Sequence, residues 1–317
     1  GNPGITALAD ISKLEEKPEA WHLGFMLGPR VNAGGRVGEA GLGVQLLTTT
    51  DPDAATGIAM RLDQYNTDRR EIESGVLDAA MAQAEQQASD GSPLILVASE
   101  GWHPGVIGIV AGRIKETYNR PACVVAIENS LGKGSGRSVP GVELGPAVIA
   151  AHQAGLLVNG GGHAMAAGFT VPEDKIADFR TFLSDHISRQ LAGERLAPDI
   201  GIDGALSPEG ATVELIELLE GAGPFGAGNP RPRFVLPSVT PINARIVGTD
   251  HVSCFLAPPE GGTRLKAIFF RAAGTPAGEA LLNARGGVLH VAGHLNIDTW
   301  QGNRKAQFII EDVAPAT

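Results

Sequence analysis

Residues 159–168 read NGGGHAMAAG, and this stretch decides how we interpret the rest of the sequence. Three consecutive glycines, Gly160, Gly161 and Gly162, let the backbone approach a ligand closely and point its amides at an anion. His163 follows at once, and its neighbours are mostly small, so that little shields the imidazole. We therefore interpret the stretch as one wall of a phosphate site, with a tight turn beside an ordinary core histidine as the alternative.

A second stretch of this kind lies near the start of the chain. Residues 28–38 read GPRVNAGGRVG, with four glycines and two arginines, one of which is Arg36. Glycine permits close approach of the backbone, and arginine offers a planar fork for phosphate. Taken alone, the stretch fits a surface loop equally well.

A third stretch, residues 133–138, reads KGSGRS. Ser135 and Arg137 are two positions apart, so on an extended strand both would face the same side. A hydroxyl beside a guanidinium suits a terminal phosphate. We expect the three stretches to converge on one phosphate pocket; the alternative for this one is a glycine-rich hairpin with a solvent-exposed arginine.

Composition indicates an ordinary soluble protein of two or three domains, with 317 residues, 43% hydrophobic and 19% charged. We find no apolar run of about 18–20 residues and no signal peptide, so we expect no membrane association. Cys123 and Cys254 lie far apart in apolar runs, which predicts reduced thiols and a cytoplasmic location. The chain begins with glycine, and we expect it to be a piece of a longer protein.

The net charge of −10 is unevenly distributed. Residues 231–306 carry nine Lys or Arg against four acids, a local charge of +5, and the remaining residues sum to −15. A basic module on an acidic protein steers a polyanion to one face. Chance clustering on a solvated surface is the alternative.

The order of predicted elements gives an α/β plus all-β protein in four parts. Residues 1–50 are predicted to be the end of a domain, and residues 51–90 a single connecting helix roughly 55 Å long. Residues 91–197 alternate strands and helices, which predicts an α/β domain. Residues 198–317 contain short β-like runs, including 233–236 and 242–247, which predict a small barrel of the oligonucleotide-binding (OB) type.

Single-strand binders stack bases on aromatic side chains, and the barrel region has five aromatic candidates. We expect most of them in the barrel core and the one in the polar turn, Trp300, at the surface. The five are Phe255, Phe269, Phe270, Trp300 and Phe308.

Metal chemistry has little support in the sequence. Two-metal hydrolysis of a phosphodiester needs several Asp or His ligands around ions roughly 3.5–4 Å apart. Asp51 and Asp53 resemble a ligand pair but lie where a helix cap belongs, and Asp250 with His251 is isolated. We expect no complete metal site in this chain.

Taken together, the motifs resemble those of the RecJ family in the DHH phosphoesterase superfamily. The resemblance rests on GPRVNAGGR at 28–36, GWHPGVIG at 101–108, GSGRS at 134–138, GGHAMAAG at 161–168 and GPFGAGNP at 223–230. It covers essentially the whole chain in order. It implies the end of a DHH phosphoesterase domain, a connecting helix, a DHH-associated α/β domain and an OB barrel.

The resemblance also implies a function, which is 5′→3′ degradation of single-stranded DNA in repair and recombination with Mg²⁺ or Mn²⁺. Ser135 and Arg137 would hold the 5′-phosphate, while Arg30, Asn32 and His163 would line the scissile phosphate. Single-strand-binding protein and a RecQ-type helicase are candidate partners in the family. DNA-binding candidates on the barrel are Arg231, Arg233, Trp300, Arg304 and Lys305.

The family's metal-binding motifs precede the region that resembles this chain. We therefore expect this chain to bind single strands without cutting them and to bind no metal alone. Two alternatives stay open: a DHH-type phosphodiesterase for short oligonucleotides or cyclic dinucleotides, and a non-catalytic nucleic-acid-binding module.

Overall fold

The computed structural model describes residues 1–15, 18–193, 199–226, 228–284, 286–299 and 302–316. It consists of two compact units, Gly1–Pro198 (unit 1) and Asp199–Thr317 (unit 2), each of which is described by itself. Among the described residues, none of the helices combines the length and the apolar character that a membrane span requires. The finer division into four parts stays a prediction.

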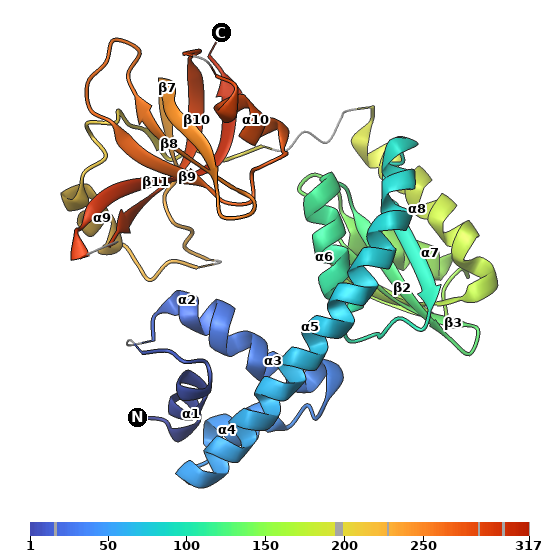
Figure 1. Cartoon of the computed structure of the whole chain (residues 1–317). Helices are drawn as coiled ribbons and strands as arrows, with labels where there is room; N and C mark the ends of the chain where they lie inside the picture. Colours follow the sequence, from blue (N-terminus) through green and yellow to red (C-terminus); the bar gives the residue numbers. More distant parts are fainter. Residues whose placement is uncertain (16–17, 194–198, 227, 285, 300–301, 317) are drawn as a thin grey trace. The chain divides into compact units, whose positions relative to one another are not determined.

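Unit 1 is organised along helix α5 (Pro52–Ser89), where the sequence predicts a helix (Figure 1). The Asp51 carboxylate accepts a hydrogen bond from the Asp53 amide at 2.9 Å, and Pro52 opens the first turn, so both start signals act as expected. The first half of α5 packs on the N-terminal helices through Leu62, and the second half packs on the sheet through Val76. The helix thus links two hydrophobic clusters.

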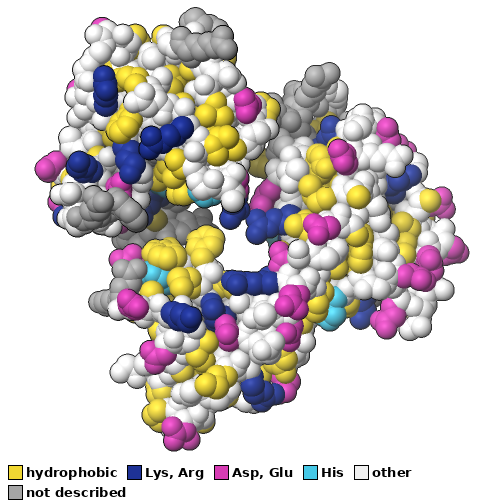
Figure 2. All heavy atoms as spheres, viewed as in Figure 1, with side chains coloured by type: hydrophobic (Ala, Val, Ile, Leu, Met, Phe, Trp, Pro, Cys, Tyr) yellow, Lys and Arg dark blue, Asp and Glu magenta, His cyan; other side chains and the backbone are white. Residues whose placement is uncertain are grey.

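In the part of the chain that the structure describes, five short helical segments precede α5. They are α1 (Pro3–Ile11), α2 (Ala20–His22), the π-helix η1 (Leu23–Leu27), α3 (Gly28–Val37) and α4 (Leu42–Thr48). Hydrophobic side chains gather at the surface over α2 in Figure 2, and Phe25 is 78% exposed. Residues 21–27, which read WHLGFML, therefore contribute only part of their side chains to a core.

The alternative interpretation of residues 28–38 as a surface loop is wrong, because most of the stretch forms helix α3. A Cβ atom on Gly34 would lie 2.7 Å from the Glu39 carbonyl oxygen and 3.2 Å from Cδ2 of Leu62. Glycine at this position therefore allows α3 to pack closely against α5, and no ligand is needed to explain it.

A five-stranded sheet with the order β1-β2-β3-β5-β4 forms the second half of unit 1. Only the β1–β2 pair is parallel, and the other pairs are antiparallel. The strands are β1 (Ile95–Glu100), β2 (Ala122–Glu128), β3 (Leu131–Arg137), β4 (Asn159–His163) and β5 (Ala166–Pro172). The helices are α6 (Ile107–Tyr118), α7 (Leu144–Gln153) and α8 (Ile176–Leu191), with the 3-10 turn η2 (Glu173–Lys175) before α8.

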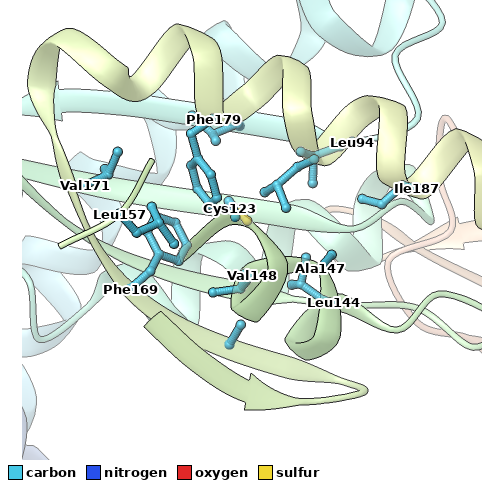
Figure 3. Packing of buried hydrophobic residues seen from close by; sticks show 14 of the residues in the cluster. Leu94, Cys123, Leu144, Ala147, Val148, Leu157, Phe169, Val171, Phe179 and Ile187 are labelled. Carbon is cyan, nitrogen blue, oxygen red and sulfur yellow. The ribbon is translucent and has the colours of Figure 1, made fainter. Parts of the chain in front are cut away.

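Helices cover both faces of this sheet. On one face α7 and α8 enclose the cluster drawn in Figure 3. In this cluster the rings of Phe169 and Phe179 meet edge to face, with their centroids 4.8 Å apart. On the other face α5 and α6 pack on Val97 and Val124. The helices cover this second face over β1 and β2. The polar side chains of β3 project from the same face.

Unit 2 is a closed barrel in which β7 pairs with β8, β8 with β9, β9 with β11, β11 with β10, and β10 with β7. The sequence prediction of a small barrel is confirmed, and the barrel has five strands. Its elements are β6 (Gly204–Ala205), α9 (Val213–Glu220), β7 (Phe234–Val247), β8 (His251–Ala257), β9 (Leu265–Phe269), α10 (Pro276–Leu282), β10 (Leu289–Asp298) and β11 (Lys305–Pro315).

Two details of the barrel differ from the prediction. The runs at 233–236 and 242–247 belong to one strand, β7, whose first part pairs with β10 and whose second part pairs with β8. Pro237 lies between Leu236 and Val239, where the pairing with β10 is interrupted, so it removes no ladder hydrogen bond there. Helix α10 was not predicted.

Both cysteines are unpaired and buried, as the sequence indicates. Burial raises the pKa of the Cys123 thiol and of the Cys254 thiol to about 12 in each case. A thiol with such a pKa stays protonated at neutral pH and is therefore a poor nucleophile. The two residues act as small hydrophobic core residues.

Candidate functional site

Three cross-strand rows of residues build the exposed part of the α6-covered face of the sheet in unit 1. The rows join β3, β5 and β4, and each contains one residue from each strand: Lys133–Thr170–Asn159, Ser135–Gly168–Gly161 and Arg137–Ala166–His163. Directly paired residues project from the same face of a sheet. The two glycines of the middle row leave open space above the sheet, because a Cβ atom on Gly161 or on Gly168 would meet nothing within 4 Å. We call this surface the trough.

The predicted strand geometry of Ser135 and Arg137 is confirmed. Both lie in β3 on the trough side, and Nη1 of Arg137 donates a hydrogen bond to Oγ of Ser135 at 3.1 Å and another to the Gly136 carbonyl oxygen at 2.8 Å. These bonds use one nitrogen of the guanidinium, and they hold the side chain in place beside the hydroxyl. The pair is therefore preorganised for an anion.

A pocket of about 430 Å³ lies over this end of β3. Its walls contain three cationic side chains and no carboxylate, and they include the first residues of α6. The cations are Arg36, Lys133 and Arg137, and the α6 residues are Ile107 and Gly108. Amides at a helix N-terminus favour an anion, so backbone and side chains act in the same direction here. We call this cavity the phosphate pocket.

Arg36 reaches the phosphate pocket because α3 and the loop before α6 touch. A Cβ atom on Gly105 would lie 2.0 Å from the Arg36 carbonyl oxygen, so only glycine allows this approach. Nη1 of Arg36 donates to the Gly105 carbonyl oxygen at 3.3 Å. Gly108 has a similar role, since its Cβ would lie 3.0 Å from both Oγ of Ser135 and Nη2 of Arg137.

The structure brings together parts of all three predicted stretches. Residues 28–38 contribute Arg36, residues 133–138 contribute Lys133 and Arg137, and residues 159–168 contribute Asn159, which precedes the glycines. Sequence reasoning missed Asn159, Thr170 and Gly108. The alternation of polar residues along β3 was a usable signal, but the pairing of β3 with β5 and β4 was not visible in the sequence.

The triple glycine is an edge strand, β4, and not a tight turn. A Cβ on Gly160 would lie 2.9 Å from side chains of Leu157 and Val148, and a Cβ on Gly162 would lie 2.3 Å from the Ala166 carbonyl oxygen. These two glycines serve packing. Only Gly161 faces the open trough.

His163 is exposed and lies in the same cross-strand row as Arg137. No hydrogen bond of its imidazole to another of the described residues is found. The alternative of a buried core histidine is therefore wrong. An exposed ring at the end of the trough is accessible to a ligand.

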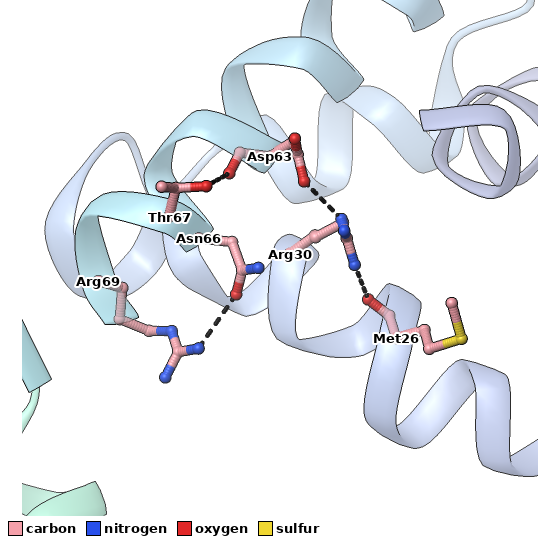
Figure 4. A network of polar contacts seen from close by, with 6 residues as sticks. All are labelled: Met26, Arg30, Asp63, Asn66, Thr67 and Arg69. Carbon is pink, nitrogen blue, oxygen red and sulfur yellow. Dashed lines mark hydrogen bonds and ion pairs between the residues drawn. The ribbon is translucent and has the colours of Figure 1, made fainter. Parts of the chain in front are cut away.

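Arg30 and Asn32 lie on α3 in different surroundings, and Figure 4 shows those of Arg30. Nε of Arg30 donates to Oδ1 of Asp63 at 2.7 Å, and Nη1 donates to the Met26 carbonyl oxygen at 2.7 Å, which fixes this side chain against α5. Asn32 is exposed. Neither residue lines the phosphate pocket.

Arg69 forms a neighbouring polar contact on α5. It donates to Oδ1 of the buried Asn66 at 3.1 Å and pairs with Glu73, and burial lowers the pKa of its guanidinium. These contacts stabilise α5 where α3 packs against it. We assign them a structural role.

Unit 2 offers a second cationic surface, a pocket of about 420 Å³ on the barrel. It is lined by Arg264, Lys266 and Lys305, together with the ring of Phe255, which is 38% exposed. Lys266 pairs with Asp298 at 2.7 Å, whereas Arg264 and Lys305 form no ion pair with any other described residue. Figure 2 shows Lys and Arg side chains among hydrophobic ones on this unit.

The other barrel arginines that we predicted are engaged by acids. Arg231 pairs with Glu220 at 2.5 Å, Arg233 with Glu311 at 2.5 Å, and Arg304 with Glu217 at 2.7 Å. All three acids lie outside residues 231–306, so the local excess of positive charge is smaller than the count within that segment indicates. Exposed pairs of this kind are weak and can open to admit a phosphate.

The expectation that most of the aromatic candidates lie in the barrel core holds for only part of them. Phe308 is fully buried, whereas Phe255 and Phe270 are 38% and 50% exposed. Phe269 is half-buried and packs against the barrel core. Trp300 lies outside the described residues.

The donor set does not fit the two-metal centre of a DHH phosphoesterase. Within the described residues, no group of three or more His, Cys, Asp or Glu side chains is placed to hold a metal ion. The Asp51 carboxylate caps α5, and Asp250 pairs with His251 at 2.8 Å without a third ligand. We derive no catalytic step through a metal from this chain.

Fold and site together define a class of protein: one chain that combines an α/β domain carrying a cationic pocket with an OB-type barrel. Comparison with known families agrees, because residues 91–189 match the DHHA1 domain and residues 202–312 match the RecJ OB domain.

Curated relatives match over nearly the whole chain. The single-stranded-DNA-specific exonucleases RecJ of Dickeya dadantii and of Escherichia coli are each 36% identical, over 326 and 324 residues. Each alignment covers 99% of this chain and 55% of the relative. The chain therefore spans about half the length of the curated relatives it matches.

A solved structure agrees with the sequence comparison. RecJ of Thermus thermophilus in complex with Mn²⁺ superposes with a TM-score of 0.82 at 27% identity, covering 100% of this chain and 44% of that one. A structure of the same protein with Mg²⁺ gives a TM-score of 0.81. This chain belongs to the RecJ family.

Proposed function

We propose that this chain is the strand-binding portion of a single-stranded-DNA 5′→3′ exonuclease that acts in DNA repair and recombination. One observation carries the proposal: a carboxylate-free pocket with three cations opens onto the glycine-floored trough. Such a site accepts a terminal phosphate and leaves room for the backbone that follows it. The names and lengths of the relatives support the same activity for the whole protein.

Residue roles follow from this geometry and from the family. Ser135, Arg137 and Arg36 hold the 5′-phosphate, and Gly161 and Gly168 give the strand space in the trough. His163 lies at the end of the trough and contacts the scissile phosphate together with Arg30 and Asn32. Arg30 would have to use the donors that Asp63 and Met26 leave unused.

The barrel would hold the strand farther from its end. Phe255 offers a partly exposed ring for stacking, and Arg264 and Lys305 offer charge for the backbone. Arg231, Arg233, Arg304 and Trp300 stay candidates for the same surface. A dinucleotide needs no such additional surface, and the comparisons do not favour a phosphodiesterase for short substrates. Affinity for a dinucleotide should therefore be far below that for a strand of a dozen or more bases.

Binding to a single strand should weaken steeply as salt is added, because each phosphate that a Lys or Arg neutralises releases counterions. With three or more phosphate contacts we expect log K to fall against log salt with a slope of about −2 or steeper. Fluorescence anisotropy of a labelled 12-base strand between low and physiological salt measures the slope. A flat response would rule out both cationic surfaces as the footprint.

Cleavage should be absent from this chain when it is tested alone. The described residues supply no group of three metal-binding side chains, and we propose that Mg²⁺ or Mn²⁺ binds to other residues of the whole enzyme. Incubation with 5′-phosphorylated single-stranded DNA and Mn²⁺ should release no mononucleotide, while an anisotropy measurement in the same buffer shows the DNA bound. Metal-dependent release of nucleotides would overturn this proposal.

Partners and location follow from the family and the composition. We propose a cytoplasmic protein that meets single-stranded DNA coated by single-strand-binding protein and unwound by a RecQ-type helicase. Pull-down of each purified partner by this chain, at physiological salt and without DNA, tests this part separately.

A further inference from the structure

A second cavity adjoins the phosphate pocket on the same sheet. It measures about 460 Å³ and shares three lining residues with the phosphate pocket, Pro104, Lys133 and Thr170. We call it the side chamber. Because the two cavities have these walls in common, they adjoin each other along β3, and we call the pair the groove.

The strand register fixes the order of groups in this groove. Leu131, Lys133, Ser135 and Arg137 occupy alternate positions of β3 and face the same side. Alternate residues of a strand are about 6.6 Å apart. Leu131 marks the side chamber, Arg137 marks the phosphate pocket, and Lys133 lies between them, so the groove changes from apolar to cationic within a few residues.

The side chamber has the chemistry of a site for a flat heteroaromatic ring. Apolar surface comes from Trp102, Pro104 and Leu131, and Leu131 is 44% exposed although it is a large aliphatic residue. Polar groups lie beside this surface and can meet the edge of a ring; they are His103, Glu128, Asn129 and Thr170.

Two further observations limit what the chamber can bind. Glu128 places a carboxylate in its wall, which disfavours a second or third phosphate in line with the first. Nδ1 of His103 accepts a hydrogen bond from the Gly105 amide at 3.0 Å, so the loop that forms the roof is held to the start of α6. The chamber is thus a formed cavity and does not suit a polyphosphate.

We propose that the side chamber binds the nucleobase of a nucleoside 5′-monophosphate whose phosphate occupies the phosphate pocket. The inference rests on the phosphate site proposed above. The ligand has two sources with the same chemistry, which are the 5′-terminal nucleotide of a strand and a free mononucleotide. In either case the nucleotide is held at both ends, by charge at the phosphate and by apolar contact at the base.

The test compares two 5′-phosphorylated strands that differ only in the terminal residue, one normal and one an abasic tetrahydrofuran. Stacking of one base on an aromatic side chain contributes enough that its loss should weaken binding about 5-fold or more. Leu131→Ser should remove most of this difference, and so should Trp102→Ala, whose melting temperature must be checked because Trp102 also packs on the core. Ile149→Ser is the matched control, since Ile149 is exposed on α7 and lines neither cavity.

A second arm separates the two ligand sources. Thymidine 5′-monophosphate and deoxyribose 5-phosphate are used as competitors against the phosphorylated strand. Stronger competition by the mononucleotide, lost in Leu131→Ser, shows that the free nucleotide uses the chamber. An abasic effect without this difference shows that only the strand terminus does.

The proposal is overturned if the abasic and normal strands bind the unmodified protein equally, or if Leu131→Ser retains the full difference. Its failure is distinguishable from failure of the phosphate site. The phosphate site is measured by comparing 5′-phosphate with 5′-hydroxyl on the same normal strand, and that comparison does not depend on the base.

Discussion

Replacing Arg137 with alanine is expected to remove most of the preference of this protein for a 5′-phosphorylated strand over the same strand with a 5′-hydroxyl. The guanidinium lies in a pocket without carboxylates and is held beside Ser135, so it can give charged hydrogen bonds to a dianionic end. A hydrogen bond to a charged group contributes about 1.5–3 kcal/mol, which corresponds to roughly 10- to 100-fold in affinity. Affinity for the 5′-hydroxyl strand should change much less.

Two variants make the experiment specific. Arg137→Lys keeps the charge but loses the planar fork, and it should retain part of the preference. Arg113→Ala removes an exposed arginine of α6 that lines neither cavity, and it should behave as the unmodified protein. Equal losses for both strand ends in Arg137→Ala would show that this arginine is merely a backbone contact.

Replacing Gly162 with alanine should destabilise unit 1 strongly, whereas the same change at the adjacent Gly161 should not. A Cβ on Gly162 would lie 2.3 Å from the Ala166 carbonyl oxygen and 2.7 Å from Cα of Ala167, and neither backbone atom can move without disrupting the β4–β5 pairing. A Cβ on Gly161 would meet nothing within 4 Å. We expect Gly162→Ala to cost about 3 kcal/mol.

Thermal unfolding measures this difference. For a unit of this size, about 3 kcal/mol corresponds to a decrease in Tm of roughly 6–12 °C. Gly161→Ala should melt like the unmodified protein and yet bind single strands more weakly, because its methyl group projects into the trough. If the two variants have the same Tm, the assignment of Gly162 to packing and of Gly161 to the ligand side is wrong.

Local signals in the sequence predicted several elements correctly. Asp51 and Pro52 mark the start of α5, and the alternation of Ser135 and Arg137 marks a strand face. Helix α10 carries the same kind of signal, since the Thr275 hydroxyl accepts from the Gly278 amide at 3.1 Å and Pro276 follows. It was missed because a helix of only seven residues shows almost no periodicity.

The remaining errors come from tertiary contacts that outweigh local preference. Glycine disfavours helices, so residues 28–38 do not look helical. Helix α3 forms nevertheless, because close contact of Gly34 with Leu62 offsets that cost. The trough itself could not be predicted, since it needs the register of β3, β5 and β4, which joins residues about 30 positions apart.

The central claim is that the pocket at Ser135 and Arg137 receives the 5′-phosphate of a single strand. A crystal structure of this chain with a short 5′-phosphorylated oligonucleotide tests it most directly. We predict that the terminal phosphate accepts hydrogen bonds from Oγ of Ser135 and from the guanidinium of Arg137, with the next nucleotide over Gly161 and Gly168. A terminal phosphate bound elsewhere, with these side chains left in contact with solvent, would contradict the account.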